Sequence, residues 1–328
     1  MFCHCFVISY KYEKITVKSY MIQDMRIKRT YAFILINMLL IMINVSAQEL
    51  EPRAYSNAPV GLNFVVSGYQ YSEGGLLFDP AVPIIDANSE VNVGIFGYLR
   101  TLEVAGMSAK AGIVLAYADL YAQGILSGEL RTRDVDGVAD PSLYFNLNFY
   151  GSPAYKLNEF RKYQQDTIAG FTIKVTPPLG QYDKDKVINV GTNRWSIKPE
   201  LGVSKAINRW VMEAMVAATY YTDNDEFDNN NVRSQDPVYS MQGHLTYTFA
   251  NKIWLSYGAT YFTGGKTSVN GMDSNDLQNN SRTGLTLAIP VNKYHSIKIL
   301  SSVGLNTRTG TDYDSISIFW QYRWGAGL

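Results

Sequence analysis

The side chains best able to act on a solute are charged residues on the polar side of stretches in which apolar and polar residues alternate. They are Lys174, Arg194, Lys198, Glu200, Glu213, Lys298 and Arg323. Because alternate residues of a strand point to the same face, these charges would gather in one polar interior. There they could form a filter or binding site for a polar solute, or a salt-bridged wall that only holds the interior in shape. Five of the seven are basic, which favours a weak preference for anions.

Catalytic chemistry has weaker support in the sequence. A Ser–His hydrolase needs a serine beside a histidine and a third group that orients the ring. His244 falls on the polar side of its stretch without an evident nucleophile on the apolar side, and His295 stands beside Ser296 at a short turn. Cys3 and Cys5 are the two cysteines, and both lie in the N-terminal segment. We therefore expect neither an enzyme nor a cofactor.

Two polar motifs resemble binding loops only in part. Residues 223–228 (DNDEFD) hold four carboxylates, but Asp228 stands where a calcium loop has its glycine. They are either a divalent-cation site at the outer surface or a solvated loop, and the second interpretation is the simpler one. Residues 264–267 (GGKT) lack the spacing of a phosphate-binding loop and end a strand instead of beginning a helix. No metal site is predicted.

The elements that must position the charges are β-strands. In residues 194–204, for example, Trp195 and Leu201 alternate with Lys198 and Glu200. Strands with one apolar and one polar face give this pattern. We predict twelve strands, at residues 60–70, 90–103, 107–116, 141–150, 167–178, 194–206, 209–222, 236–250, 252–263, 281–290, 295–307 and 313–324.

Short and long connections alternate between these strands. The long, polar ones are expected at residues 71–89, 117–140, 179–193, 223–235 and 264–280. An outer-membrane barrel has tight periplasmic turns and long extracellular loops in this order. Residues 151–166 fall on the short side although they are long, and a short amphipathic helix at the periplasmic rim would account for them.

The apolar faces match the height of a membrane. Trp210 and Tyr220 lie on the same face of residues 209–222, ten residues apart. At about 3.3 Å per residue and a tilt of about 40°, they span about 25 Å, the height of the apolar band between aromatic girdles. A soluble β-sandwich would also alternate. The girdle spacing, the unequal loops and the charged content of only 18% favour the barrel.

The N-terminal segment has the layout of a secretory signal peptide. Basic residues within 26–29 precede an apolar stretch at residues 31–45, and small residues follow. The apolar stretch has about 15 residues, whereas a membrane-spanning helix needs about 20, which disfavours an anchor. Residues 1–24 are interpreted as an upstream extension, with Met25 or Met21 as the true start.

We predict cleavage after Ala47, so that residues 1–47 are removed and residues 48–328 form one outer-membrane domain. N-terminal sequencing of the protein extracted from membranes is expected to begin at Gln48. Recovery of Met25 at the N-terminus of the mature protein would contradict this prediction.

Several segments resemble a known family. Residues 189–202 (NVGTNRWSIKPELG) are similar to the central signature of bacterial outer-membrane transporters named "putative MetA-pathway of phenol degradation". Further similar pieces, in the order of the family, are residues 136–141, 178–182, 264–271, 280–284 and 321–324. The resemblance covers residues from about 55 to 328. It implies a β-barrel in the outer membrane that moves small, often aromatic or hydrophobic, molecules.

The sequence therefore predicts an all-β protein, a transmembrane antiparallel up-and-down β-barrel of about twelve strands in the bacterial outer membrane. We expect a transporter or channel that passes or binds a small solute in its lumen. The alternative is a structural or assembly barrel with partner-docking loops and no transport, and an outer-membrane hydrolase comes third. Expected partners are outer-membrane lipid, a small-molecule solute and the barrel assembly machinery. A net charge of zero gives no reason to expect nucleic acid.

Overall fold

The computed structural model describes residues 51–77, 84–126, 129–228 and 230–328. In this part of the chain, no helix is long and apolar enough to cross a membrane. The predicted signal peptide and its cleavage site after Ala47 lie outside the described residues.

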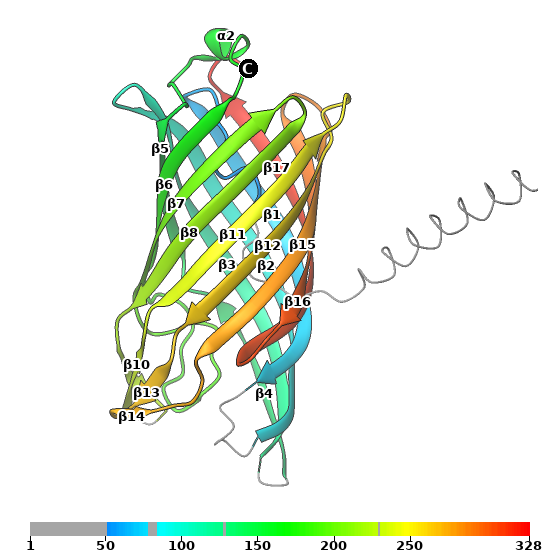
Figure 1. The fold of residues 1–328 in the computed structure, drawn as a ribbon. Coiled ribbons are helices and arrows are strands. Elements are labelled where there is room, and N and C mark those ends of the chain that lie inside the picture. Colours follow the sequence, from blue (N-terminus) through cyan, green and yellow to red (C-terminus); the bar gives the residue numbers. More distant parts are fainter. Residues whose placement is uncertain (1–50, 78–83, 127–128, 229) are drawn as a thin grey trace, which may run out of the picture. The chain divides into compact units, whose positions relative to one another are not determined.

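Twelve of the strands formed by the described residues close into an antiparallel barrel (Figure 1). Each pairs with its neighbour in chain order, and the first pairs with the last, as predicted for an up-and-down barrel. The strands are β1 (Leu62–Leu77), β2 (Ile84–Val104), β3 (Met107–Leu126), β5 (Ser142–Tyr150), β6 (Thr167–Thr176), β7 (Ser196–Ile207), β8 (Trp210–Tyr221), β11 (Val238–Thr248), β12 (Trp254–Gly264), β15 (Gln278–Pro290), β16 (His295–Asn306) and β17 (Gly310–Gly325).

The two ends of the barrel differ as the sequence predicts. Short turns join β2 to β3, β7 to β8, β11 to β12 and β15 to β16 at one end, which we call the turn end. The longer connection from β5 to β6 lies at the same end and contains the short helix α2 (Leu157–Phe160), close to the C-terminus in Figure 1. The helix predicted within residues 151–166 is thus confirmed. The opposite end is called the loop end.

Two of the loop predictions are wrong. Residues 71–89 and 117–140 were expected to be long polar loops, but β1, β2 and β3 continue far into them. An additional strand, β4 (Glu129–Val138), pairs with the second half of β3. Beyond the membrane the outer face need not be apolar, and on the end of β3 it carries polar residues such as Asp119 and Gln123. The alternation that identifies a membrane strand is therefore missing there.

The loop-end segments that follow β8 and β12 form a small sheet of their own. The strands β9 (Asn224–Phe227), β10 (Asn231–Gln235), β13 (Thr267–Val269) and β14 (Met272–Asp273) pair in the order β14-β13-β10-β9. Backbone pairing between β10 and β13 ties the connection after β8 to the connection after β12. Two connections that are distant in sequence are thus joined at the loop end by backbone hydrogen bonds.

The outer face of the barrel carries the apolar belt. On β8, Met212, Ala214 and Val216 are exposed, whereas the residues between them are buried inside, which confirms the predicted facing of this strand. Aromatic rings gather near the turn end, where the ring centroids of Trp210 and Tyr247 are 4.7 Å apart. A second stack in this region joins His295, Trp320, Tyr322 and Trp324. This is the composition of an aromatic girdle at a membrane interface.

The facing predicted for β2 is wrong. From the sequence alone, alternation along the strands predicts that Phe96 and Tyr98 face the lumen, and it places Tyr144 and Phe319 there as well. Phe96 is 48% exposed on the outer face, and the ring of Tyr98 lies 6.3 Å from that of Trp324 in the girdle. The strand is apolar on both faces, so the sequence pattern does not distinguish inside from outside. Tyr144 and Phe319 do face inward, where Phe319 packs on Gly68.

Candidate functional site

The inner face of the barrel is largely polar. Buried there are hydroxyl and amide side chains from many strands, among them Asn146, Asn148, Thr172, Ser204, Thr246, Ser256 and Thr286. Several bond to one another, as in the 2.8 Å hydrogen bond from Thr246 Oγ1 to Ser256 Oγ. Polar side chains lining the interior and apolar ones facing outward are the arrangement of a membrane barrel rather than of a soluble one.

Four of the predicted charges meet inside the barrel. Lys174 on β6 lies directly opposite Lys198 on β7, so both are on one wall, as predicted. Lys198 Nζ lies 3.4 Å from Glu200 Oε2 in an ion pair. Glu213 lies on the next strand, and its neighbour across the strand pair is His244. The predicted pairing of opposite charges on this wall is therefore present for Lys198 and Glu200.

The centre of this site is a segment that precedes the first strand. Residues 51–61, called the inner segment, run inside the barrel against side chains of its inner wall. Tyr55 of this segment is 0% exposed and packs against Ile168 and Met215. Its ring lies directly over Gly202, where an added Cβ would come within 2.0 Å of the ring. Only glycine at this position of β7 leaves room for the tyrosine.

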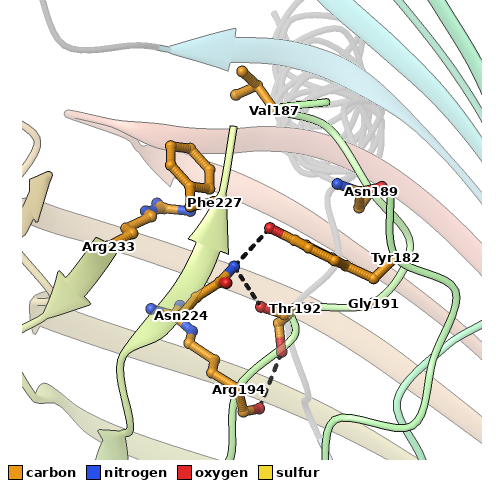
Figure 2. Close-up of a pocket in the computed structure, with 9 residues that line it drawn as sticks. All are labelled: Tyr182, Val187, Asn189, Gly191, Thr192, Arg194, Asn224, Phe227 and Arg233. Atoms are coloured by element: carbon orange, nitrogen blue, oxygen red, sulfur yellow. Dashed lines mark hydrogen bonds between the residues drawn. The ribbon is translucent and has the colours of Figure 1, made fainter. Parts of the chain in front are cut away.

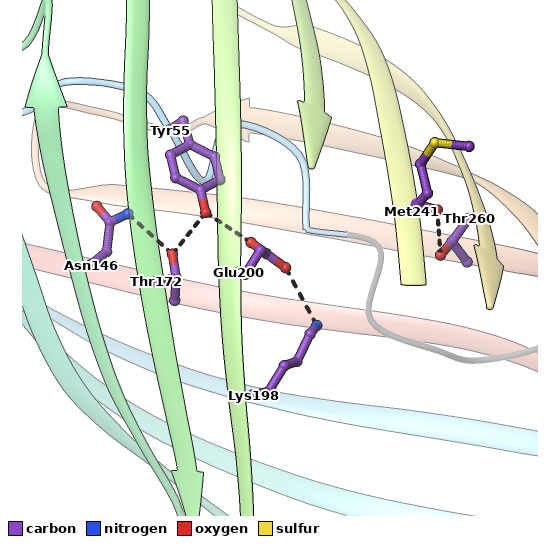
Figure 3. Close-up of polar contacts among 7 residues, drawn as sticks. All are labelled: Tyr55, Asn146, Thr172, Lys198, Glu200, Met241 and Thr260. Atoms are coloured by element: carbon purple, nitrogen blue, oxygen red, sulfur yellow. Dashed lines mark hydrogen bonds and ion pairs between the residues drawn. The ribbon is translucent and has the colours of Figure 1, made fainter. Parts of the chain in front are cut away.

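Hydrogen bonds join Tyr55 to the charged wall (Figure 3). Its hydroxyl lies 3.1 Å from Thr172 Oγ1 and donates to Glu200 Oε1 at 3.1 Å. The amide of Asn146 donates to the same Thr172 hydroxyl. Burial, with the nearby Glu200 carboxylate, raises the pKa of the Tyr55 phenol, so that it remains a donor. The network therefore connects Lys198, through Glu200, to the inner segment.

Charged side chains of the wall hold the main chain of the inner segment. The Glu213 carboxylate accepts hydrogen bonds from the backbone N–H groups of Arg53 and Tyr55. On the other side, Lys110 Nζ donates to the Ala54 carbonyl at 2.6 Å. Burial lowers the pKa of the Arg53 guanidinium, although the Glu213 carboxylate opposes this effect. Opposite charges thus clamp the backbone from two strands.

Further contacts fix the two ends of the segment. The Arg53 guanidinium carbon lies 5.6 Å from the centre of the Trp254 ring, a distance typical of a cation–π contact. Lys298 Nζ, another predicted site residue, lies 3.9 Å from Glu51 Oε1. Near the first strand, the Thr101 hydroxyl donates to the Pro59 carbonyl. The inner segment is therefore tied to the wall by side chains from several strands.

The other predicted site residues lie away from this centre. Arg323 is at the turn end, where its Nε donates to the Lys293 carbonyl at 2.8 Å. Arg194 precedes β7 at the loop end, where it and Arg233 line a pocket of about 130 Å³ (Figure 2). The seven charges do not form a single ring. They occupy the turn end, the middle and the loop end of the barrel.

Sequence reasoning missed three basic residues of the lumen. Lys110 contacts the inner segment, and Arg53 belongs to it. Arg282 on β15 is fully buried near the loop end, with its guanidinium carbon 5.9 Å from the centre of the Phe262 ring. Alternation along β3 and β15 could have placed Lys110 and Arg282 inside. No periodic signal marks Arg53, since the inner segment is not a strand.

A closed barrel with a polar interior and an apolar, girdled exterior is an outer-membrane β-barrel, because only such a closed sheet satisfies its backbone within lipid. The chain belongs to the family described as "Putative MetA-pathway of phenol degradation", which matches residues 77–319.

Solved structures share the fold. The chain is similar to the COG4313 outer membrane channel from Pseudomonas putida F1, with 23% identity and a TM-score of 0.73 over 84% of this chain and 100% of that chain. It is also similar to the transport unit of the autotransporter AIDA-I from Escherichia coli, with 10% identity and a TM-score of 0.51 over 84% and 93%. No curated protein matches the sequence.

Proposed function

We propose that this protein is an outer-membrane channel that passes small solutes through its lumen, including aromatic or hydrophobic molecules. The observation that carries this proposal is the inner segment. Its residues, Tyr55 above all, fill the lumen while belonging to no barrel strand. A segment held by side-chain contacts can leave or shift without breaking the backbone pairing of the barrel, and such segments open at lower free energy than core strands.

A structural or assembly barrel without transport is the second candidate. The same inner segment favours it, because a lumen occupied by Tyr55 and its partners has a well-packed interior. The two candidates differ in whether the segment moves under a membrane potential or in the presence of a solute. We further propose export through the predicted signal peptide and insertion by the barrel assembly machinery.

A hydrolase has no support from the histidines. His295 stacks on Trp320 at the outer face, and its Nδ1 accepts a hydrogen bond from the indole N–H. His244 is buried inside, and neither ring nitrogen has a hydrogen-bond partner among the described residues. Neither ring is thus placed to take a proton from a serine, as a Ser–His mechanism requires.

Single-channel recording in planar bilayers tests the proposal. A channel gives discrete conductance steps, and a solute that enters the lumen reduces or interrupts them when it is added to one side. Small aromatic acids are suitable first solutes. Absence of steps above the bilayer background, in the natural protein and in a variant with a disrupted inner segment, would reject transport and favour the structural barrel.

The excess of basic groups predicts weak anion preference of the open channel. Lys174 and Lys198 lie side by side on the inner wall, and charges in a narrow lumen act strongly on passing ions. We expect the double substitution Lys174→Glu, Lys198→Glu to shift the preference toward cations, because two positive charges become negative. Reversal potentials under a salt gradient measure this change.

The matched control for this prediction is Lys184→Glu with Lys186→Glu. These lysines are exposed in the connection between β6 and β7, so the change in net charge is the same while the lumen is unaltered. We expect little change in the reversal potential. Cation preference of the natural protein, or equal shifts in both double variants, would contradict a filter role for the inner wall.

A further inference from the structure

The loop-end pocket is a second place in the molecule where a ligand could be held. It lies between the connection from β6 to β7 and the strands β9 and β10 of the small sheet, and its volume is about 130 Å³ (Figure 2). Hydrogen bonds fix its walls, since Asn224 Nδ2 donates to Tyr182 Oη at 2.7 Å and to the Thr192 carbonyl at 3.3 Å. These hydrogen bonds give the pocket a defined shape.

Two guanidinium groups line this pocket. Arg194 is only 9% exposed, its guanidinium carbon lies 4.4 Å from the centre of the Tyr221 ring, and its Nη2 donates to Gln235. Its Nη1 is buried without a hydrogen-bond partner among the described residues. Arg233 lies with its guanidinium carbon 5.1 Å from the centre of the Phe227 ring. A buried charged donor without an acceptor is costly, and a ligand that accepts from it removes the cost.

Two nearby carboxylates, those of Asp140 and Asp276, are engaged with other donors. Asp140 accepts hydrogen bonds from the backbone of Gly180 and from both the backbone and the hydroxyl of Thr192. Asp276 likewise accepts from the backbone and hydroxyl of Thr267. Within the described part of the chain, no carboxylate forms an ion pair with Arg194 or Arg233. The two arginines are therefore not ion-paired, although Asp140 and Asp223 near Arg194, and Asp276 near Arg233, offset part of their charge.

The pKa shifts of the two arginines agree with this geometry. Burial, together with the charge of Arg233, lowers the pKa of Arg194 to about 10. Burial also lowers the pKa of Arg233. Both groups stay protonated at neutral pH, and a bound anion would offset the two effects that lower the pKa of Arg194.

The remaining walls and the size of the pocket define the rest of the ligand. Phe227 and Val187 offer apolar surface beside the two guanidinium groups. A dry apolar cavity of about 150 Å³ holds one benzene molecule, so the pocket has room for about one ring. Guanidinium groups bind carboxylates through paired, charge-assisted hydrogen bonds.

We propose that the loop-end pocket binds a small organic monocarboxylate whose apolar body is about the size of one six-membered ring. Its carboxylate pairs with the Arg194 and Arg233 guanidinium groups, and its apolar body lies against Phe227 and Val187. Binding itself does not depend on transport. Only the further step, that the bound anion is a solute about to enter the channel, rests on the proposed function.

Calorimetric titration of the purified full-length barrel in detergent micelles tests the site, with benzoate, benzamide and acetate as probes and empty micelles as the blank. We expect benzoate to bind about tenfold more tightly than acetate, because the ring adds buried apolar area. Benzamide keeps the shape but lacks the charge, so we expect no measurable binding. Equal binding of benzoate and benzamide, or of benzoate and acetate, would overturn the proposal.

Variants assign the binding to the two arginines. Arg194→Gln and Arg233→Gln are each expected to weaken benzoate binding about 10- to 100-fold, since each removes a charge-assisted hydrogen bond. The matched control is Arg131→Gln, on the exposed end of β4, where the side chain pairs with Glu129 and is 67% exposed. Unchanged affinity in both pocket variants would overturn the assignment. The comparison of probes on the natural protein needs no variant, so it stands even if Arg194→Gln fails to fold.

The result for this site is separate from that for the channel. Conductance without benzoate binding would overturn the pocket and leave the channel standing. Benzoate binding without conductance, in the natural protein and in the variant with a disrupted inner segment, would overturn the channel and leave the pocket standing as a surface binding site.

Discussion

Replacement of residues 52–58 by a glycine–serine segment of equal length is expected to raise the single-channel conductance severalfold. The replacement removes Tyr55, which is fully buried in the lumen, and Arg53, which lies against Trp254. A flexible glycine–serine chain has no side chain to fill the space over Gly202 and pays a larger entropy cost for staying ordered. The segment should therefore leave the wall, and the polar lumen becomes continuous.

A single substitution should give a graded version of the same result. Tyr55→Ala removes a buried aromatic ring, a change that costs ~3–5 kcal/mol at well-packed sites, and it removes the hydrogen bond to Glu200. A cost of this size shifts the equilibrium between bound and released segment by two orders of magnitude or more. We expect longer or more frequent open periods in planar bilayers, with the barrel itself intact.

The matched control is Tyr150→Ala. Tyr150 is a tyrosine at the turn end of β5 that faces outward and is exposed, so its loss leaves the lumen unchanged. Natural conductance in both tyrosine variants and in the glycine–serine variant would mean that the inner segment does not obstruct the path. The channel would then need another explanation for its closure.

The barrel strands could be predicted because lipid and water impose opposite demands on their two faces. On β8, each outward residue between Trp210 and Tyr220 is apolar and alternates with an inward one such as Glu213. This period is a direct result of strand geometry, so the facing follows without knowledge of the partners. The same reasoning gives the wrong facing for β2, which is apolar on both faces: Phe96 lies outside, and Val93 and Ile95 lie inside. When both faces of a strand are apolar, only its pairing with neighbouring strands determines which face points outward.

The inner segment could not be predicted for a different reason. Its contacts are few, specific and distant in sequence, as with Arg53 and Glu213, which are 160 residues apart. A segment without a repeating pattern carries no local signal for its partners. Glu213 and Glu200 were correctly placed in the lumen, but their role as acceptors for Tyr55 depends on the fold.

The position of Arg194 shows the limit of alternation at a strand end. Extending the period of β7 backward predicts that Arg194 faces the lumen, but the strand begins at Ser196. Before that residue the chain turns, with Asn193 at a positive φ of 52°, and Arg194 follows the loop into its pocket. The basic side chain of Arg194 suggests that it interacts with an anion. Its proximity to Arg233 follows only from the structure.

An arginine at Ala214 is expected to destabilise the barrel by ~2–4 kcal/mol, the cost of a basic side chain at the bilayer midplane. Ala214 lies near the middle of β8 on the outer face, between Met212 and Val216, of which Val216 is 54% exposed toward lipid. The guanidinium would have no polar partner on this face and must snorkel to an interface or draw in water. Reversible urea unfolding of the protein in phospholipid vesicles measures the loss of free energy.

The control places the same charge on the same strand. Thr219 is half-buried on the inner face near the loop end, and in a polar lumen Thr219→Arg is expected to cost much less, about 0–1 kcal/mol as at a membrane interface. The difference between the two variants isolates the facing of β8 from the general effect of a bulky cation on a strand. A soluble barrel would solvate its outer face, so Ala214→Arg would be the milder substitution. Equal costs at both positions would contradict the assignment of the outer face to lipid.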